Sequence, residues 1–428
     1  EMQEEAKMLT AVVGINWGDE GKGRMVDLLS ADYDIVCRYQ GGNNAGHTVI
    51  NEHGKFVLNL LPSGISREGT VNVMGNGMVI DIEHLVHEIH ALREKGVHIA
   101  PDNLKISDKA VICLPWHKMQ DIMEEDRLKD KKYGSTRRGI GPVYADKYMK
   151  KAVRMEDLFY PDALGEKIEE LTEWKNLTVR GYGHEPISAT DIMAWLREYG
   201  ELIKPYICDV SDYLYTEAGV GKNILFEAQL GALRDIEFGI YPYTSSSCTL
   251  AGYATIGAGI PGLKLDRTVG IMKAYSTCVG EGPFTVEMFG GEAEALRRAG
   301  AEYGAATGRP RRVGAFDVPA SRYGVRMQGA DCIALTKLDV LSYMKKIPVC
   351  VAYDIDGELT DKFPVGERLA AAKPVFEYME GFGDISACRR PEELPKAAMD
   401  YIRYLENAVG CKIKYVSVGA DRDDYVEL

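Results

Sequence analysis

The sequence lacks paired cysteines and long hydrophobic runs. Its nine cysteines are spread singly over 428 residues, without a C-x-x-C pair. Neither a disulfide framework nor a zinc site is therefore expected. No stretch approaches the roughly eighteen apolar residues of a membrane-spanning helix, so we expect no membrane partner. The first residues, EMQEE, are too acidic for a signal peptide. We expect a cytoplasmic protein with a disordered lead-in over residues 1–8.

An excess of positive charge is also absent. The chain has 51 Lys and Arg against 64 Asp and Glu, a formal net charge of −13. This balance disfavours nucleic acid as a partner. Basic residues that gather in spite of it are candidates for binding small anions. Hydrophobic residues make up 46% of the chain, enough for a large core. Since no repeat or long linker is present, we expect a single unit over residues 9–428.

Strand-like runs alternate with helical ones along most of the chain. This alternation predicts an α/β fold with a large, central, mostly parallel sheet flanked by helices. Residues 155–218 are mostly helical, with polar interruptions near 176–184, and predict an inserted helical subdomain. The expected strands are 9–14, 34–39, 71–74, 223–227, 331–335, 347–351 and 413–418. The expected helices are 24–29, 116–132, 395–409 with a stop at Gly410, and an amphipathic one between a capping Asp81 and Gly96.

The most informative motif is Gly-Asp-Glu-Gly-Lys-Gly at residues 18–23, between a predicted strand and a predicted helix. Such a glycine-rich turn points backbone N–H groups at an anion, and the helix N-terminus adds positive potential. Lys22 adds a full charge, so the motif predicts phosphate binding. Asp19 and Glu20 are unexpected there, because carboxylates repel phosphate. We interpret them as supplying a base or a metal ligand beside the phosphates.

This motif is neither a P-loop nor a dinucleotide-binding loop. A P-loop needs G-x-x-x-x-G-K-[ST], but Asn16 stands five residues before Gly21, and Gly23 replaces the Ser or Thr. The G-x-G-x-x-G pattern also fails. An ordinary strand–helix turn with a solvated lysine is the alternative interpretation. Three glycines, a lysine and two acids within six residues favour a functional loop.

Three further segments carry groups suited to a ligand. His47, in a Gly- and Asn-rich stretch, can donate to an oxygen that gains charge, although a structural histidine is the commoner case. Lys337 and Asp339 follow a predicted strand. An Asp there can accept two hydrogen bonds from guanine, although a solvated Lys and a capping Asp are as common. Residues 305–312 hold three arginines suited to carboxylate or phosphate, and residues 134–142 have a similar composition.

Together these segments resemble the adenylosuccinate synthetase family over nearly the whole chain. The resemblance implies an α/β fold related to the P-loop NTPases, and a homodimer. It also implies a ligase that joins IMP to L-aspartate, with GTP as co-substrate and Mg²⁺ as cofactor. The shared motifs are residues 18–23 (GDEGKG), 44–48 (NAGHT), 138–142 (RGIGP), 241–243 (YPY), 307–312 (TGRPRR) and 335–339 (LTKLD).

The resemblance also implies catalytic roles for Asp19, His47 and Lys22. Asp19 would remove the N1 proton of the hypoxanthine, and O6 would then attack the γ-phosphate of GTP to give a 6-phosphoryl intermediate. The amine of aspartate would displace that phosphate. His47 would donate to the charge that develops between O6 and the γ-phosphate. Asp19 and the Gly46 carbonyl would ligate Mg²⁺, which prefers oxygen ligands.

The same resemblance assigns the remaining residues by ligand. Lys150, which is assigned to IMP, would reach the site from the second subunit. The GTP set is Gly18, Glu20, Gly21, Lys22, Gly23, Gly46, Thr48, Arg311, Lys337, Asp339, Ser417 and Gly419. The IMP set is Asp19, Asn44, Thr136, Lys150, Leu230, Ser245 and Arg309, and the aspartate set is Ala305, Ala306, Thr307, Arg309 and Arg311.

The chain departs from the family pattern at three places. Where the family reads Phe-Glu-Gly-Ala-Gln-Gly, residues 226–231 read Phe-Glu-Ala-Gln-Leu-Gly. Leu230 thus replaces a nucleotide-contacting glutamine, and Gln229 lies one residue early, where an extended backbone would point its side chain the other way. Lys150 replaces an arginine, and Ala306 replaces a hydroxyl residue. Losing one polar contact costs about 1–3 kcal/mol, which weakens or alters binding without abolishing catalysis.

Three functions are consistent with these residues. The first is adenylosuccinate synthesis from IMP, GTP and aspartate. The second is a paralogue that keeps the phosphoryl activation but uses another purine nucleotide or another amine. The third is a catalytically silent GTP-binding protein, against which the presence of both Asp19 and His47 argues.

Overall fold

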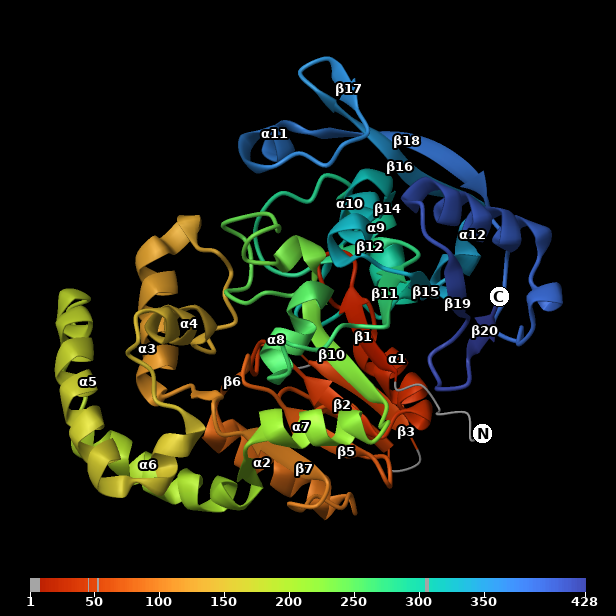
Figure 1. The fold of residues 1–428 in the computed structure, drawn as a ribbon. Helices are drawn as coiled ribbons and strands as arrows, with labels where there is room; N and C mark the ends of the chain where they lie inside the picture. The colour runs from red at the N-terminus through yellow and green to blue at the C-terminus, as the bar shows by residue number, and fades with distance from the viewer. Residues whose placement is uncertain (1–7, 45, 52–53, 305–307) are drawn as a thin grey trace.

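A ten-stranded sheet forms the centre of the molecule and is flanked by helices (Figure 1). The computed structural model describes residues 8–44, 46–51, 54–304 and 308–428. Neighbouring strands are parallel, except that the edge strand β20 is antiparallel to β19. The predicted α/β fold with a mostly parallel sheet is confirmed. The strand order is β20 (Tyr425–Glu427), β19 (Ile413–Ser417), β15 (Cys332–Thr336), β11 (Arg267–Lys273), β1 (Leu9–Gly14), β10 (Ile224–Gly231), β2 (Ile35–Arg38), β5 (Val71–Met74), β7 (Leu104–Ser107) and β9 (Ile207–Cys208).

Strand β1 lies in the interior of this sheet, between β10 and β11. All of its residues are buried, as the apolar run 9–14 predicts for a strand covered on both faces. Parallel strands bring their carboxyl ends to one edge, where ligands bind in open α/β sheets. The segments after β1, β2, β10, β15 and β19 therefore meet at that edge, and they contain most of the predicted site residues.

The amphipathic helix predicted after Asp81 is α2 (Ile82–Glu94). The Asp81 side chain accepts a hydrogen bond from His84 N at 3.2 Å, which confirms the predicted cap. The helix predicted over 116–132 ends earlier, since α3 (Pro115–Leu128) is followed by a 3₁₀ turn. Further helices include α1 (Lys22–Leu29), α4 (Ile140–Tyr148), α8 (Ala254–Ala258), α9 (Gly290–Ala299), α10 (Val318–Gln328) and α12 (Lys396–Val409), which Gly410 ends as predicted.

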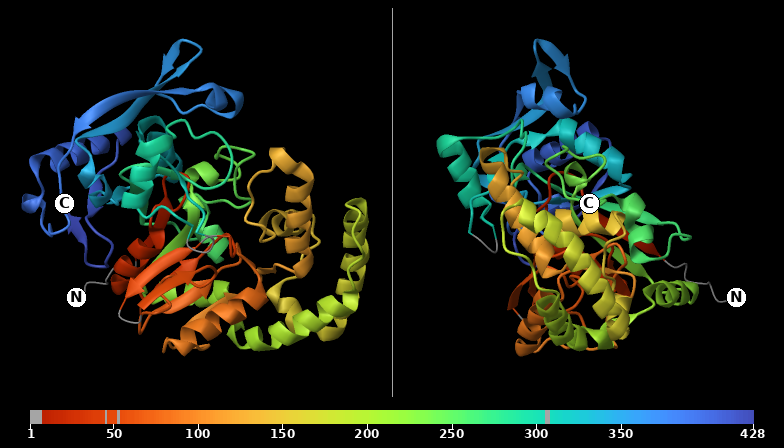
Figure 2. Two further views of the ribbon diagram at one scale, coloured as in Figure 1. Left: turned by 180° about the vertical axis from the view of Figure 1, so that it is seen from behind. Right: turned by 90° about the vertical axis from the view of Figure 1, so that its left-hand side faces the viewer.

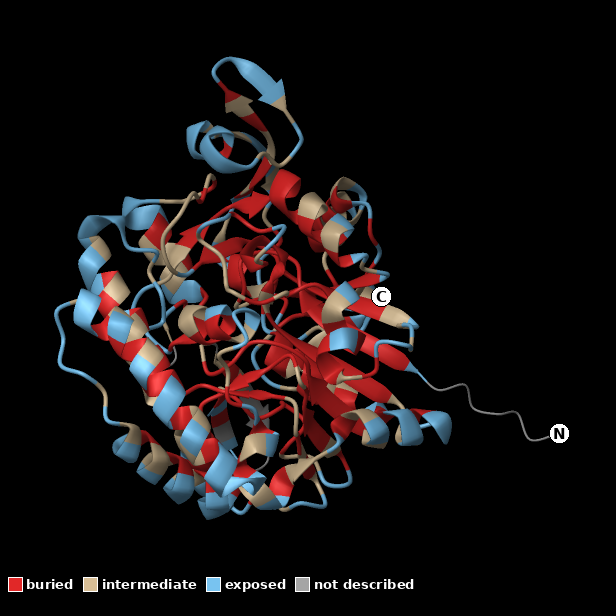
Figure 3. Cartoon of the chain, turned by 60° about the vertical axis from the view of Figure 1, so that its left-hand side comes forward, coloured by how far each residue is buried: buried red, intermediate tan, exposed pale blue. Residues whose placement is uncertain are grey.

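The region predicted to be helical contains α5 (Pro161–Gly181), α6 (Ala189–Ile203) and α7 (Val210–Gly219). Helices α5 and α6 form a curved outer layer (Figure 2), and their buried stripes face the rest of the molecule (Figure 3). The polar residues near 176–184 do not interrupt α5, which continues to Gly181. Asn176 instead binds the backbone of Ile187 through both amide atoms, at 2.7 and 3.0 Å, and so holds the following loop against the helix.

The strand predicted at 347–351 lies outside the central sheet. It is part of β16 (Lys346–Ile355), which pairs with β14 (Phe316–Asp317), β17 (Glu358–Thr360) and β18 (Lys373–Glu380). Strands β16 to β18 and α11 (Gly366–Ala371) lie at the top of Figure 1. No helix among the described residues is both long and apolar enough to cross a membrane. The nine cysteines are all free.

The predicted lead-in falls almost wholly on residues 1–7, which lie outside the described residues. Met8, the last residue assigned to it, is exposed but hydrogen-bonded to the sheet. Its N–H donates to Asn223 Oδ1 at 2.9 Å, and its carbonyl accepts from Ile224 N at 3.0 Å. Met8, the first described residue, is therefore already part of the hydrogen bonding that leads into β1.

Candidate active site

The loop over residues 18–23 connects the carboxyl end of β1 to the first turn of α1. Gly18 and Gly21 have φ values of +104° and +96°, which side-chain-bearing residues rarely adopt. Gly21 is the N-cap of α1, and Lys22 begins the helix. Strand, glycine turn and helix N-terminus thus follow one another as the motif predicts for an anion site.

Glu20 is buried beneath this loop and stabilises it. Its carboxylate accepts hydrogen bonds from the N–H groups of Gly18 at 2.8 Å and Asn16 at 3.1 Å. It also pairs with Lys22 Nζ at 2.6 Å, and both side chains are at most 3% exposed. One of the two unexpected acids therefore serves as the counter-charge of the loop lysine.

Asp19 is the acid of this loop that reaches the surface of the site. Its φ is +58°, and its side chain is 28% exposed. Arg311 Nε lies 3.4 Å from Asp19 Oδ2. Lys337, Leu230 and Lys150, also predicted site residues, share left-handed φ values. Such backbone conformations cost about 1–3 kcal/mol each and gather at functional sites.

His47 begins β3 (His47–Asn51) and packs against the last glycine of the loop. A Cβ added at Gly23 would lie 2.8 Å from His47 Cβ. His47 Nδ1 is 2.5 Å from Glu227 Oε1, and Nε2 is buried without a hydrogen-bond partner. Burial lowers the pKa of His47 from its ordinary value of 6.5, while the Glu227 carboxylate acts to raise it. The ring is thus held on one side and presents the other nitrogen.

Glu227 is a site residue that the sequence reasoning missed. It is fully buried in β10, and its carboxylate also accepts from Ser63 N at 2.8 Å and Ser63 Oγ at 2.5 Å. Burial would raise the pKa of Glu227, but His47 and Arg38 lower it below its ordinary value, so it is ionised. A charged residue within a buried strand was the available signal.

The predicted guanine-reading residues lie together at the carboxyl ends of β15 and β19. Arg24 of α1 donates to Ser417 Oγ at 2.7 Å and to Gly419 O at 2.6 Å. Burial raises the pKa of Asp339, against the effects of Lys337 and Arg24. Asp339 Oδ1 is buried without a hydrogen-bond partner. The predicted guanine-binding residues thus lie near a buried carboxylate oxygen, Asp339 Oδ1, that has no hydrogen-bond partner.

Thr336 stands where GTP-binding proteins usually have Asn. It connects this region to the loop over residues 18–23, which we call the phosphate loop after its predicted role. Its Oγ1 donates to the backbone oxygen of Glu20 at 2.6 Å. A Cβ added at Gly21 would lie 3.7 Å from Thr336 Cγ2. The hydroxyl group of Thr336 therefore ties the segment that carries Lys337 and Asp339 to the phosphate loop.

Glu302 is the centre of a buried ionic cluster that the sequence reasoning also missed. Its carboxylate binds Lys273 and Lys337, each at 2.9 Å, Arg311 at 2.7 Å and the Tyr275 hydroxyl at 2.5 Å. Burial would raise the pKa of Glu302, but the three cations lower it well below its ordinary value. Burial lowers the pKa of Lys273 to about 8, although Glu302 acts in the opposite direction.

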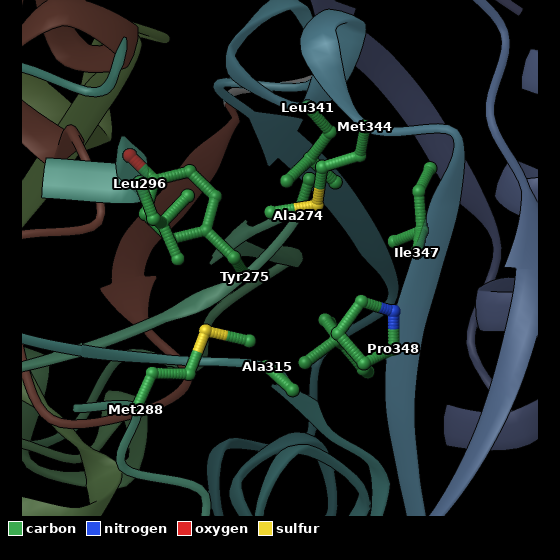
Figure 4. Close-up of a pocket in the computed structure, with 11 residues that line it drawn as sticks. Ala274, Tyr275, Met288, Leu296, Ala315, Leu341, Met344, Ile347 and Pro348 are labelled. Carbon is green, nitrogen blue, oxygen red and sulfur yellow. The ribbon is translucent and has the colours of Figure 1, made fainter. Parts of the chain in front are cut away.

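A small cavity lies behind the ring of Tyr275 (Figure 4). Its volume is about 10 Å³, barely the space of one water molecule. Because it is mostly apolar and this small, it is no nucleotide site. Its lining residues are Ala274, Tyr275, Met288, Leu296, Gly314, Ala315, Phe316, Leu341, Met344, Ile347 and Pro348.

Gln229 and Leu230 differ from the expectation for an extended strand. Val12 pairs with Glu227 and Gly14 with Gly231, so β10 bulges against β1 between these pairs. Leu230 has a φ of +64°, and its Cδ2 would lie 3.4 Å from a Cβ added at Gly18. The simple alternation argument therefore fails here, because the backbone is not extended at Leu230.

Two carboxylates of α3 hold the segment that carries Thr136. Glu125 accepts from two backbone N–H groups of residues 133–134, both at 3.1 Å, and Asp121 accepts from Ser135 Oγ at 2.6 Å. Both carboxylates are buried, whereas Thr136 is exposed. The predicted IMP contact thus lies on a surface segment with buried supports.

Ser245 is joined to the site through other side chains. Its Oγ lies 3.3 Å from Ser247 Oγ, which donates to Gln40 Oε1 at 2.8 Å. Gln40 Nε2 in turn donates to the backbone oxygen of Gln229 at 2.7 Å. Lys150, by contrast, is exposed after α4, and no side-chain hydrogen bond or ion pair within the described residues joins it to another site residue.

The aspartate-binding residues predicted at Ala305, Ala306 and Thr307 lie outside the described residues. Arg309 is exposed just after them, and Arg311 belongs to the Glu302 cluster. Gly46 and Thr48 flank His47, and both are half-buried. For Mg²⁺, the predicted ligands are the accessible Asp19 carboxylate and a backbone carbonyl. This donor set fits Mg²⁺, which commonly takes one or two protein oxygens together with phosphate oxygens and waters.

Comparisons with known proteins agree with this geometry. A model of the adenylosuccinate synthetase family matches residues 11–426. The adenylosuccinate synthetase of Caldanaerobacter subterraneus subsp. tengcongensis is 43% identical, over 98% of this chain and 99% of the relative. That of Heliobacterium modesticaldum is 44% identical, over 97% and 98%. The structure of fully ligated adenylosuccinate synthetase from Plasmodium falciparum is 36% identical, with a TM-score of 0.92, over 98% of this chain and 99% of that one.

These matches extend over both the phosphate loop and the segments that depart from the family pattern. They do not favour a paralogue with another nucleotide or amine, nor a silent GTP-binding protein. The chain belongs to the adenylosuccinate synthetase family, whose members join L-aspartate to IMP in a GTP-dependent reaction.

Proposed function

We propose that the carboxyl edge of the sheet is the site of this ligation, with Asp19 as the base and His47 as the hydrogen-bond donor. The Asp19 carboxylate removes the N1 proton of bound IMP, and O6 attacks the γ-phosphorus of GTP, releasing GDP. The amine of aspartate then attacks C6, and phosphate leaves. Lys22 and the loop glycines bind the transferred phosphoryl group.

The arrangement of His47 carries this proposal. Its Nδ1 is held by Glu227, its Nε2 is buried without a hydrogen-bond partner, and its Cα and Cβ lie close to Gly23 of the phosphate loop. Because the Glu227 carboxylate only accepts, Nδ1 donates to it, and Nε2 donates when the ring is protonated, the state that Glu227 favours. A donor oriented in advance stabilises charge in the transition state without reorganisation. Mg²⁺ at Asp19 and the Gly46 carbonyl would neutralise phosphate charge when bound.

The two ends of the site are assigned to different ligands. Asp339, Lys337, Ser417 and Gly419 bind guanine, which the buried, unused Asp339 Oδ1 supports. Asn44, Thr136, Ser245 and Arg309 bind IMP. Residues 305–307 and the arginines that follow bind the aspartate carboxylates.

The protein is a homodimer in this proposal, and Lys150 enters the site of the partner subunit. Lys150 is exposed, and it follows the exposed apolar residues Tyr148 and Met149 directly. Such residues next to a solvated cation are consistent with an interface. We also propose a cytoplasmic location, which the nine free cysteines support.

The Asp19→Asn variant tests the proposal in an assay with IMP, GTP and aspartate. GDP release and adenylosuccinate absorbance are measured together. Wild-type protein is expected to form both products, and the variant to lose about 10²–10⁴-fold in kcat, since it lacks the base. The matched control is Asp102→Asn, whose side chain is 71% exposed, and it should be fully active. Absence of wild-type turnover, or an active Asp19→Asn enzyme, would contradict the proposal.

A further inference from the structure

Gln229 is the residue whose position departs most clearly from the family pattern, and its side chain is fully buried beside Asn44. We propose that Gln229 is a positioning residue that fixes the Asn44 amide with its NH₂ group facing the phosphate of bound IMP. This inference rests on the proposed function, in which Asn44 contacts IMP.

Arg38 sets the direction of the hydrogen bonds. Its side chain is fully buried at the end of β2, and a guanidinium can donate hydrogen bonds but never accept them. Arg38 donates to the backbone oxygens of Asn59 at 2.5 Å and Gly42 at 3.4 Å. It also donates to Gln229 Oε1 through Nη2. The atom of Gln229 that faces Arg38 must therefore be its oxygen.

The orientation of Asn44 follows from that of Gln229. With Oε1 toward Arg38, the Gln229 Nε2 group faces Asn44 and donates to Asn44 Oδ1. The backbone N–H of Gly42 also donates to Asn44 Oδ1, at 3.3 Å. Because both neighbours are donors, Asn44 must present its oxygen inward. No hydrogen bond within the described residues engages Asn44 Nδ2.

This orientation matters for an anionic ligand. A phosphate accepts hydrogen bonds, so an outward NH₂ group attracts it, whereas an outward carbonyl oxygen would repel it. The amide of Gln229 lies close against Gly41, where a Cβ would overlap its Oε1. Leu230 has no hydrogen-bonding group to offer the nucleotide. Gln229 thus contributes to nucleotide binding indirectly, through Asn44.

The Gln229→Glu variant tests the inference. The new carboxylate still accepts from Arg38, but it cannot donate, so it accepts from Asn44 and turns the Asn44 oxygen outward. The KM for IMP should rise about tenfold, with kcat and the KM for GTP and aspartate kept within about twofold. The inhibition constant of inosine, which lacks the phosphate, should stay unchanged. A merely structural role would leave the KM for IMP unchanged, because Glu is isosteric with Gln and pairs with Arg38.

Two further variants separate the possible failures. Gln229→Ala removes the donor without adding charge, and a rise of about threefold in the KM for IMP is expected. If the melting temperature of Gln229→Glu shows that this variant does not fold, Gln229→Ala alone tests the inference. Asn44→Ala tests the underlying contact. If Asn44→Ala raises the KM for IMP but neither Gln229 variant does, the inference is wrong and the proposed function stands. If Asn44→Ala has no effect, the assignment of Asn44 to IMP is wrong, and the inference fails with it.

Discussion

The proposed GTP side and the proposed IMP–aspartate side of the site are built differently. Lys22, Asp339 and Ser417 stand at the ends of parallel strands or on the helix that follows, and buried charges hold the loops between them. Thr136, Lys150 and Arg309 are exposed and lie outside the strands of the sheet. The difference teaches that the groups proposed for phosphoryl transfer are held by buried contacts, whereas part of the set proposed for the acceptor substrates lies on the periphery.

The strongest test of this contrast is Glu302→Gln, which removes the shared anion of the proposed GTP side. Lys273, Lys337 and Arg311 would lose their counter-charge inside the protein, and breaking such a buried pair costs about 3–5 kcal/mol of stability. We expect kcat/KM to fall at least about 10²-fold, with the KM for GTP affected most. Thermal unfolding and steady-state kinetics measure the two effects.

The pH dependence of the same variant gives a second measurement. Glu302 raises the pKa of Lys273 against the larger effect of burial, so its removal lowers that pKa below about 8. The loss of activity on the alkaline side should therefore begin at a lower pH than in the wild type. Glu358→Gln in the exposed pair with Arg368 is the control, and a change below about 0.5 kcal/mol is expected there. If the Glu302→Gln enzyme were stable and active, buried charges would not be what holds the proposed GTP side in place.

Glu227→Gln tests the proposed GTP side through His47, and we expect a smaller loss of activity than for Glu302→Gln. The amide can still accept a hydrogen bond from His47 Nδ1, so the ring keeps its place. It no longer carries the charge that raises the pKa of His47, so the protonated ring becomes less stable. We expect kcat to fall about 10–100-fold with the KM values unchanged, and the pH at which His47 loses its proton to move lower. Equal changes in kcat and KM would instead indicate a general loss of structure.

Features that depend on neighbouring residues could be predicted from the sequence. The strand at 71–74, the Asp81 cap and the turn at Gly410 agree with the structure because a local pattern determines each. The strand, glycine turn and helix at residues 9–29 could be predicted in the same way, since the glycines, Lys22 and the start of α1 follow one another in the chain.

Features that depend on distant residues could not be predicted. Glu302 meets Lys273 and Lys337 only because β11 and β15 are adjacent in the sheet. Glu227 reaches His47 across 180 residues. The bulge at Leu230 changes side-chain direction in a way that strict alternation cannot anticipate. Pairings between strands decide these contacts, and a single sequence does not state them.

The smallest effect is expected on the peripheral side, at Lys150. Lys150→Ala should reduce activity about tenfold by raising the KM for IMP, because an exposed lysine binds phosphate as a point charge. If Lys150 enters the partner's site, mixing Lys150→Ala chains with inactive Asp19→Asn chains creates dimers with one intact composite site. Random pairing then gives about a quarter of the wild-type activity. Activity no higher than the sum of the separate variants would place Lys150 in its own subunit's site, and the peripheral side would then also belong to a single chain.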